Sequence, residues 1–172
     1  AVRLAHYQHD QYEYDLCDRL GLCVWTEVGL VNTISADNDT LIIADGFAGN
    51  IRQQLTELIR QNYNHPSIII WGTSNELYQM SDEIFALYTE LNVLARSEDK
   101  SRLVSFADAQ FWGRFLELPA DVIGINRYFG WYIDGADDAF GKWLDGYHAN
   151  QKRAVAITEY GAGGAISQHK DN

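Results

Sequence analysis

Two glutamates occupy positions from which a pair of carboxylates could perform acid–base chemistry. Glu76 comes shortly after the apolar run at 67–71, and Glu159 directly follows the apolar run at 154–158. If both runs are strands of a parallel sheet, the two side chains emerge at the edge where α/β folds bind ligands. Hydrolysis of a glycosidic bond needs such a pair, in surroundings that keep one protonated and the other ionised. The simpler alternative is that each glutamate is a salt-bridge or capping residue.

The elements that would position these residues alternate along the chain. Short apolar runs predict strands over 1–7, 22–27, 67–71, 103–107, 122–125 and 154–158, and helical spacing predicts helices over 10–20, 47–63, 84–96 and 139–147. Asp10 is a suitable N-cap for the first helix, and Gly21 stands where that helix should stop. A short helix or turn is expected over 111–118, and a long irregular connection over 28–46.

This alternation, without hairpin signals, predicts a parallel sheet. An open doubly wound sheet and a (β/α)8 barrel both fit. The barrel is favoured because every predicted strand exit carries a polar or ionisable residue, as a barrel rim would require: His6, Glu27, Glu76, Asp108, Asn126 and Glu159. The chain has 172 residues, whereas a complete barrel usually has about 250. We therefore expect one partial barrel domain over 1–172, with about six of the eight strands.

Composition limits the classes of partner. The chain is 47% hydrophobic and carries a net charge of −11, which argues against nucleic acid and anionic membranes as partners. Glycine-rich phosphate-binding motifs are missing after the early strands, which weakens the nucleotide-binding version of the fold. No run of 18 apolar residues is present. The two cysteines, Cys17 and Cys23, are interpreted as buried thiols.

Two motifs in order carry a family resemblance. Asn-His-Pro-Ser at 64–67 leads to Asn75 and Glu76, and Ile-Thr-Glu-Tyr-Gly occupies 157–161. Together they resemble glycoside hydrolase family 2, which includes β-galactosidases, β-glucuronidases and β-mannosidases with a retaining (β/α)8-barrel domain. Stretches 3–7, 21–27 and 126–132 resemble the second, third and sixth strands of that barrel. The resemblance implies that the first and eighth strands and the flanking β-sandwich domains are missing.

The resemblance implies a role for several residues. Glu76 would be the general acid/base, Glu159 the nucleophile, and Asn75 a donor to the sugar 2-hydroxyl. Tyr128 would hydrogen-bond the nucleophile, and His6 would contact sugar hydroxyls, with a purely structural imidazole as the alternative. Three weaker substrate-binding candidates are Asn126, Trp112 and Glu27; the last two fit a core role and a salt-bridge role equally well.

No cofactor is expected. Some relatives hold magnesium with ligands after the third strand, and the stretch at 28–33 has no such residues. His6 and His9 lack an evident third ligand, so no metal is predicted there. The expected partners are a β-linked oligosaccharide or glycoside and the rest of a longer chain, with a homo-oligomer left open and the compartment unassigned. The segment alone is expected to be weakly active or inactive.

The choice of sugar is less constrained. The tail over 159–165 with Gln168 and His169, and the sequence Trp-Thr-Glu at 25–27, look most like bacterial β-galactosidases, so this activity is favoured, with β-glucuronidase next. A non-catalytic carbohydrate-binding fragment is a further alternative, and an open sheet that binds a phosphorylated ligand is another. The retaining reading predicts that the carboxyl groups of Glu76 and Glu159 lie about 5–5.5 Å apart.

Overall fold

The computed structural model describes residues 1–31, 46–78, 81–110, 113–135 and 138–162. Its centre is a six-stranded sheet in which each strand pairs in parallel with the next strand of the sequence. The strands are β1 (Val2–Leu4), β2 (Val24–Glu27), β3 (Ile68–Asn75), β4 (Leu103–Asp108), β5 (Val122–Asn126) and β6 (Ala154–Glu159). Sequence order and spatial order coincide, as expected for consecutive units of a barrel.

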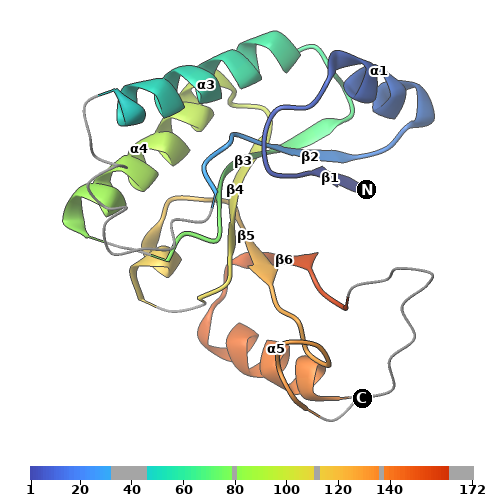
Figure 1. The fold of residues 1–172 in the computed structure, drawn as a ribbon, viewed down its shortest axis with the longest axis vertical. Helices are drawn as coiled ribbons and strands as arrows, with labels where there is room; N and C mark the ends of the chain where they lie inside the picture. The colour runs from blue at the N-terminus through green and yellow to red at the C-terminus, as the bar shows by residue number, and fades with distance from the viewer. Residues whose placement is uncertain (32–45, 79–80, 111–112, 136–137, 163–172) are drawn as a thin grey trace.

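The helices lie on the convex side of the curled sheet (Figure 1). They are α1 (Gln11–Leu20), α3 (Phe47–Asn62), α4 (Asp82–Glu98) and α5 (Ala139–Asn150), with a 3₁₀ turn, η1, over Gly113–Glu117. The predicted partial (β/α)8 barrel is therefore confirmed. No helix in the described ranges is long and apolar enough to cross a bilayer.

Local sequence signals set several helix boundaries. The Asp10 carboxylate accepts a hydrogen bond from the N–H of Tyr12, and Gly21 ends α1 in the left-handed conformation with φ of 65°. Ser81 caps α4 by accepting a bond from the N–H of Ile84. These caps satisfy backbone groups that the first and last turns of a helix leave unpaired.

Some predicted boundaries and burials were wrong. The strand predicted over 67–71 continues as β3 through Gly72 to Asn75, because these small and polar residues keep pairing with β4. The first strand ends at Leu4, earlier than the predicted residue 7. Cys17 is buried as expected, but Cys23 is exposed.

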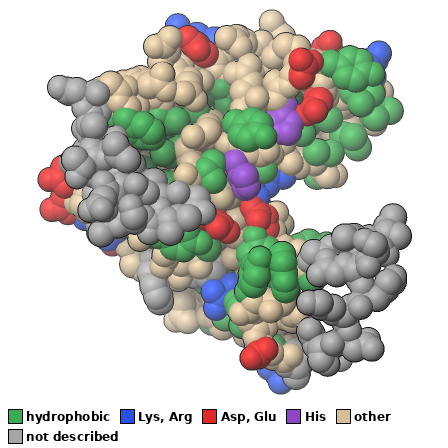
Figure 2. All heavy atoms as spheres, in the orientation of Figure 1, with side chains coloured by type: hydrophobic (Ala, Val, Ile, Leu, Met, Phe, Trp, Pro, Cys, Tyr) green, Lys and Arg blue, Asp and Glu red, His purple; other side chains and the backbone are tan. Residues whose placement is uncertain are grey.

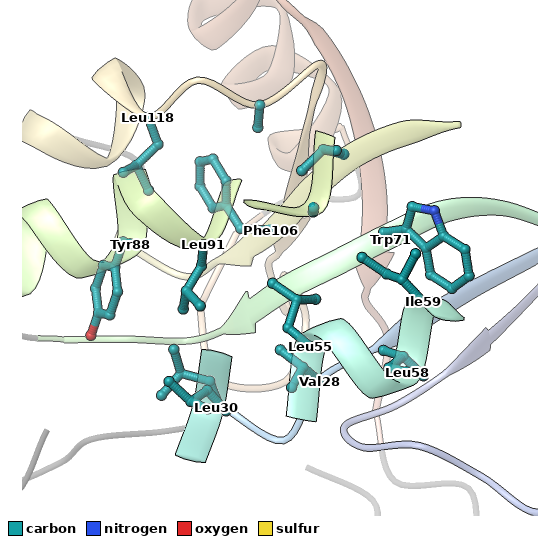
Figure 3. Close-up of a cluster of buried hydrophobic side chains, with 14 of the residues drawn as sticks. Val28, Leu30, Leu55, Leu58, Ile59, Trp71, Tyr88, Leu91, Phe106 and Leu118 are labelled. Carbon is teal, nitrogen blue, oxygen red and sulfur yellow. The ribbon is translucent and has the colours of Figure 1, made fainter. Parts of the chain in front are cut away.

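The main core fills the space between the sheet and helices α1, α3 and α4 (Figure 3). Trp71 on β3 and Phe106 on β4 meet apolar side chains of α3 and α4 there, and both are almost completely buried. The apolar positions of α3 that face this core are Ile51, Leu55, Leu58 and Ile59. The helical spacing found in the sequence thus corresponds to burial of one face of each helix.

The concave side of the sheet is less filled. A hollow of about 350 Å³ is lined by residues of both edge strands, including Val2 of β1 and Ile157 of β6. Ile69, on β3, also lines it and stays 42% exposed, although its neighbours in the strand are buried. Among the described strands, β1 and β6 each have a neighbour on one side only.

A buried carboxylate ties the strands to the helical layer. Asp99 accepts hydrogen bonds from Trp71 Nε1 at 2.9 Å and from Arg102 Nη1 at 2.7 Å, and its other oxygen accepts from Ser101. Burial by itself would raise the pKa of Asp99, but the bonds from Ser101, Arg102 and Trp71 outweigh it and hold this pKa well below its usual range. The ionised carboxylate is therefore part of the folded structure.

Replacement of Asp99 should destabilise the fold. Asp99→Ala leaves the indole N–H and the Arg102 guanidinium without their acceptor, so we expect the free energy of unfolding at neutral pH to fall by about 3 kcal/mol. Because the pKa of Asp99 is lowered by folding, this difference should shrink as the pH falls below about 4. Urea denaturation measures it, with exposed Asp145→Ala as the control. An equal loss in both variants would contradict the assigned role.

Candidate active site

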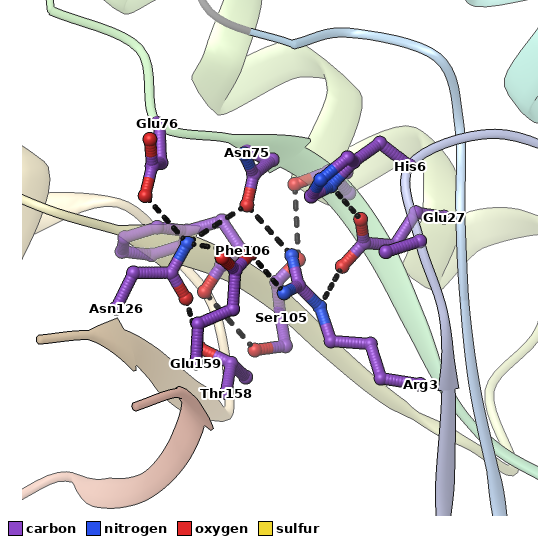
Figure 4. A network of polar contacts seen from close by, with 12 residues as sticks. Arg3, His6, Glu27, Asn75, Glu76, Ser105, Phe106, Asn126, Thr158 and Glu159 are labelled. Atoms are coloured by element: carbon purple, nitrogen blue, oxygen red, sulfur yellow. Dashed lines mark hydrogen bonds and ion pairs between the residues drawn. The ribbon is translucent and has the colours of Figure 1, made fainter. Parts of the chain in front are cut away.

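Polar side chains from five of the strands and their exits converge at the carboxyl end of the sheet (Figure 4). Hydrogen bonds connect Arg3, which was not proposed from the sequence, with most of the residues that were. The proposed residues in this network are His6, Glu27, Asn75, Glu76, Asn126, Tyr128 and Glu159. Parallel strands in sequence order place these exits side by side.

The amide of Asn126 lies between the two glutamates. Its Nδ2 donates to Glu76 Oε1 at 2.8 Å and to Glu159 Oε1 at 2.9 Å, and it lies 3.1 Å from Asn75 Oδ1. Thr158 Oγ1 donates to Asn126 Oδ1 at 2.6 Å, which orients the amide so that its NH₂ group faces the carboxylates. Glu76 Oε1 and Glu159 Oε1 bond the same nitrogen, so the distance between them cannot exceed the sum of the two hydrogen-bond lengths. That sum is smaller than the roughly 6.5 Å at which the carboxyl separations of inverting enzymes begin.

Three donors surround the Glu159 carboxylate. Arg3 Nη1 donates to Oε1 at 2.5 Å, Asn126 donates to the same oxygen, and the Tyr128 hydroxyl donates to Oε2. Burial alone would raise the pKa of Glu159, but the hydrogen bonds from Tyr128 and Arg3 and the charge of Arg3 outweigh it and lower this pKa. Burial and the same hydrogen bond raise the pKa of the Tyr128 phenol. An ionised carboxylate in this position has the properties of a nucleophile.

Arg3 connects three strands through one guanidinium. Besides Glu159, it donates through Nε to Glu27 Oε1 and through Nη2 to Asn75 Oδ1, both at 2.6 Å. Arg3 was not identified as a site residue from the sequence alone. A charged residue between Val2 and Leu4 in a short apolar strand was the available signal, since a strand interior rarely holds an unpaired arginine.

Glu27 is positioned to support other residues. Its side chain is 1% exposed, and its oxygens face Arg3 Nε and, at 3.3 Å, His6 Nδ1. Its neighbour across β2 and β3 is Gly72, where a Cβ would lie 2.7 Å from Glu27 Cγ, so only glycine leaves room for this carboxylate. This burial favours the salt-bridge alternative for Glu27 over direct contact with a substrate. The hydrogen bond to Glu27 raises the pKa of His6.

Aromatic side chains extend the site beyond β5. Trp131 and Tyr132 stack with ring centroids 4.1 Å apart, and both rings contact the edge or face of Tyr128. Both remain exposed, at 46% and 68%. Figure 2 shows acidic and histidine side chains gathered next to a hollow between the part of the molecule with α1, α3 and α4 and the part with α5. The combination suits a ligand with hydroxyl groups and an apolar face.

Trp112, a substrate-binding candidate from the sequence, is outside the described residues. His9 bonds Glu13 and the carbonyl of Ala5.

One group in the described ranges has the spacing of metal ligands. It consists of Asp15, Asp18 and His65 at the opposite, amino-terminal end of the strands. There His65 Nδ1 lies 2.6 Å from Asp18 Oδ2, and Asp18 Oδ1 accepts from the N–H of Ser67. The pairing connects α1 to the segment that enters β3, which is a structural role.

Comparisons with known proteins agree with this geometry. A family model described as glycosyl hydrolases family 2, TIM barrel domain, matches residues 1–169. A β-glucuronidase of Bacteroides fragilis is 38% identical over the whole chain, which covers 24% of that relative. An FMN-binding β-glucuronidase from Faecalibacterium prausnitzii superimposes with a TM-score of 0.83 at 37% identity, covering 99% of this chain and 26% of that one. A structure from Bacteroides fragilis, assigned provisionally as a β-galactosidase, gives 0.81 at 36% identity, covering 99% and 24%.

The hydrogen bond from Tyr128 predicts a measurable effect on Glu159. Tyr128→Phe removes a donor to the ionised carboxylate, so the pKa of Glu159 should rise. A ¹³C NMR titration of glutamate carboxyl carbons, with the Glu159 signal identified through Glu159→Gln, measures the change. The exposed Tyr12→Phe on α1 should leave the titration unchanged. A Glu159 titration that is the same in Tyr128→Phe and the wild type would show that the bond does not stabilise the ionised form.

The ion pair between Glu27 and His6 predicts a second titration shift. Glu27→Gln keeps the shape of the side chain but removes the negative charge beside the imidazole, so the pKa of His6 should fall. NMR titration of the imidazole Cε1–H signals follows all five histidines, and the other four serve as internal controls. If His6 titrates unchanged, Glu27 does not stabilise the imidazolium.

Proposed function

The chain belongs to family 2 of the glycosyl hydrolases, and on this basis we propose that the protein cleaves terminal β-linked sugars by a retaining double displacement. The observation that carries the proposal is the Asn126 amide, which bonds one oxygen of Glu76 and one of Glu159. This shared donor holds one oxygen of each carboxyl group closer together than the spacing of an inverting pair, which supports a retaining mechanism. The chain spans about a quarter of the length of the relatives described above, so the proposal concerns the full-length protein.

The donors around each carboxyl group support a division of roles. Glu159, with Arg3, Asn126 and Tyr128 as donors and a lowered pKa, is the nucleophile. Within the described ranges, Glu76 has no cationic partner in its hydrogen bonds, and it is the general acid/base. Asn75, whose Oδ1 accepts from Arg3, directs its amide toward the sugar 2-hydroxyl. His6, held by Glu27, contacts another sugar hydroxyl.

The reaction then proceeds in two steps. A Glu159 oxygen forms a bond to the anomeric carbon while the bond from that carbon to the glycosidic oxygen breaks, and the proton of Glu76 moves to the leaving oxygen. In the second step, water attacks the anomeric carbon and displaces Glu159, and Glu76 takes the proton of the water. Each step inverts the anomeric configuration, so the overall reaction retains it.

We propose β-glucuronides as the substrates. The support is that the Bacteroides fragilis and Faecalibacterium prausnitzii relatives, at 38% and 37% identity, are both described as β-glucuronidases. The sequence analysis favoured β-galactosides. This second candidate is kept because the other Bacteroides fragilis structure, at 36% identity, is assigned as a β-galactosidase.

Removal of each glutamate should give a distinct product with azide. In Glu159→Gly, azide enters from the face that the carboxylate has vacated, so an activated aryl β-glycoside should yield the α-glycosyl azide. In Glu76→Gly, azide attacks the covalent intermediate and should yield the β-glycosyl azide, while hydrolysis of unactivated glycosides falls about 10²–10⁴-fold. Proton NMR of the anomeric signal distinguishes the products.

The full-length wild type tests the choice of sugar. Its kcat/KM is measured on an aryl β-glucuronide, an aryl β-galactoside and an aryl β-mannoside, and we expect the highest value for the glucuronide. The opposite pairing of azide products would exchange the two roles. Bound sugar without turnover of any glycoside would support a carbohydrate-binding fragment and overturn the enzyme assignment.

A further inference from the structure

The two oxygens of Glu76 have different surroundings. Oε1 accepts a bond from Asn126 Nδ2, which also bonds Glu159, so Oε1 faces the centre of the site. Oε2 accepts a bond from the hydroxyl of Tyr78 at 3.2 Å. The amide of Asn126 can only donate to Oε1, whereas a hydroxyl next to Oε2 can also accept, so these surroundings favour Oε2 as the oxygen that carries the transferred proton. Tyr78 therefore lies next to the oxygen that exchanges the proton.

The backbone conformation at Glu76 brings the side chain of Tyr78 next to the Glu76 carboxyl group. Glu76 has φ of 49°, and among the described residues no other non-glycine residue has a positive φ. Its N–H donates to the carbonyl of Ala107 at 2.9 Å, which holds this turn against β4. Leu77 is 1% exposed and anchors the segment in the core, whereas Tyr78 is 43% exposed. The turn thus places Leu77 inside and the Tyr78 hydroxyl beside the carboxyl group.

The Tyr78 hydroxyl is a neutral group in an acidic neighbourhood. Burial, followed by the charge of Glu76 and the hydrogen bond to it, raises the pKa of Tyr78 to about 12, and Asp108 and Glu159 act in the same direction. The phenol therefore keeps its proton at the pH of any glycosidase assay. A hydroxyl can donate to an ionised carboxylate and can also accept from a protonated one, which an amide N–H or a guanidinium cannot do.

We propose that Tyr78 is a positioning residue for proton transfer by Glu76. Its hydroxyl holds Oε2 on the leaving-group side of the site, accepting from Glu76 before the first proton transfer and donating to it afterwards. This inference rests on the proposed glycosidase function and adds a residue that the sequence analysis did not single out. This role predicts that loss of the Tyr78 hydroxyl lowers kcat/KM most for substrates whose leaving group must be protonated.

Two glycosides of one sugar separate this role from a general structural one. The full-length Tyr78→Phe variant is compared with the wild type on an alkyl β-glycoside, whose leaving group must be protonated, and on the 2,4-dinitrophenyl β-glycoside, whose leaving group departs as an anion. The sugar is the one that the wild type cleaves best. We expect kcat/KM to fall about tenfold on the alkyl glycoside and to stay within about twofold on the dinitrophenyl glycoside.

A matched control is available in Tyr63→Phe. Tyr63 is 44% exposed, almost the same as Tyr78, and it lies at the amino-terminal end of β3, with Arg102 over its ring. This variant should leave kcat/KM unchanged on both glycosides. Thermal unfolding of both variants should match that of the wild type, because neither hydroxyl lies in the core.

Three results would overturn the proposal. Equal losses on both glycosides, or no loss on either, would show that Tyr78 does not act on proton transfer. A Tyr78→Phe protein that unfolds at a clearly lower temperature would show that the hydroxyl is structural. If the wild type itself cleaves neither compound for any sugar, the proposed glycosidase function fails first, and this outcome is distinguishable because it does not depend on Tyr78.

Discussion

A single guanidinium determines the electrostatics of the site. Arg3 is shared between the carboxylates of Glu27 and Glu159 and also bonds the amide of Asn75, so its three nitrogens reach β2, β6 and β3. Only the planar fork of arginine can make three bonds in fixed directions; a lysine ammonium could replace the charge but not this geometry. With Tyr128 and Arg3 as donors, Glu159 stays ionised although it is partly buried. Without Arg3, Glu27, Glu76 and Glu159 would lie close together with no arginine or lysine bonded to them among the described residues.

Two glycines in the strands beneath these residues, Gly72 and Gly124, leave space that a larger residue would fill. A Cβ at Gly124 would lie 2.9 Å from the Trp25 ring and from Thr158 Cγ2, so this glycine lets the indole of β2 reach across to β5. Trp25 in turn has the Arg3 guanidinium over its ring, at 5.9 Å. Gly72 performs the corresponding function for Glu27. The polar residues on top are therefore positioned by contacts within the strands, which fix their geometry more tightly than loops would.

Much of the fold followed from local patterns, whereas the site required long-range information. Asp10 and Gly21 delimit α1 because capping is a local property of the backbone, and helical spacing located α3 and α4 within a few residues. The end of β3 was misjudged because Gly72 and Asn75 have low strand preference, and pairing with β4 overrides it. Glu76 and Glu159 could be proposed from their strand exits. Arg3 offered only its charge within an apolar strand, and Tyr78 offered no signal, since the partners of both depend on which atoms they meet after folding.

The contact between Arg3 and Glu159 joins residues 156 positions apart, nearly the two ends of the described chain. Each strand docks beside its predecessor, so the sheet can grow step by step through short loop closures, but the nucleophile meets its cation only when β6 is in place. During synthesis, Arg3 emerges well before Glu159, and the other two donors, Asn126 and Tyr128, emerge between them. The site is therefore complete only when both β1 and β6 are in place, and loss of either strand would separate Arg3 from Glu159 while the helical core persists.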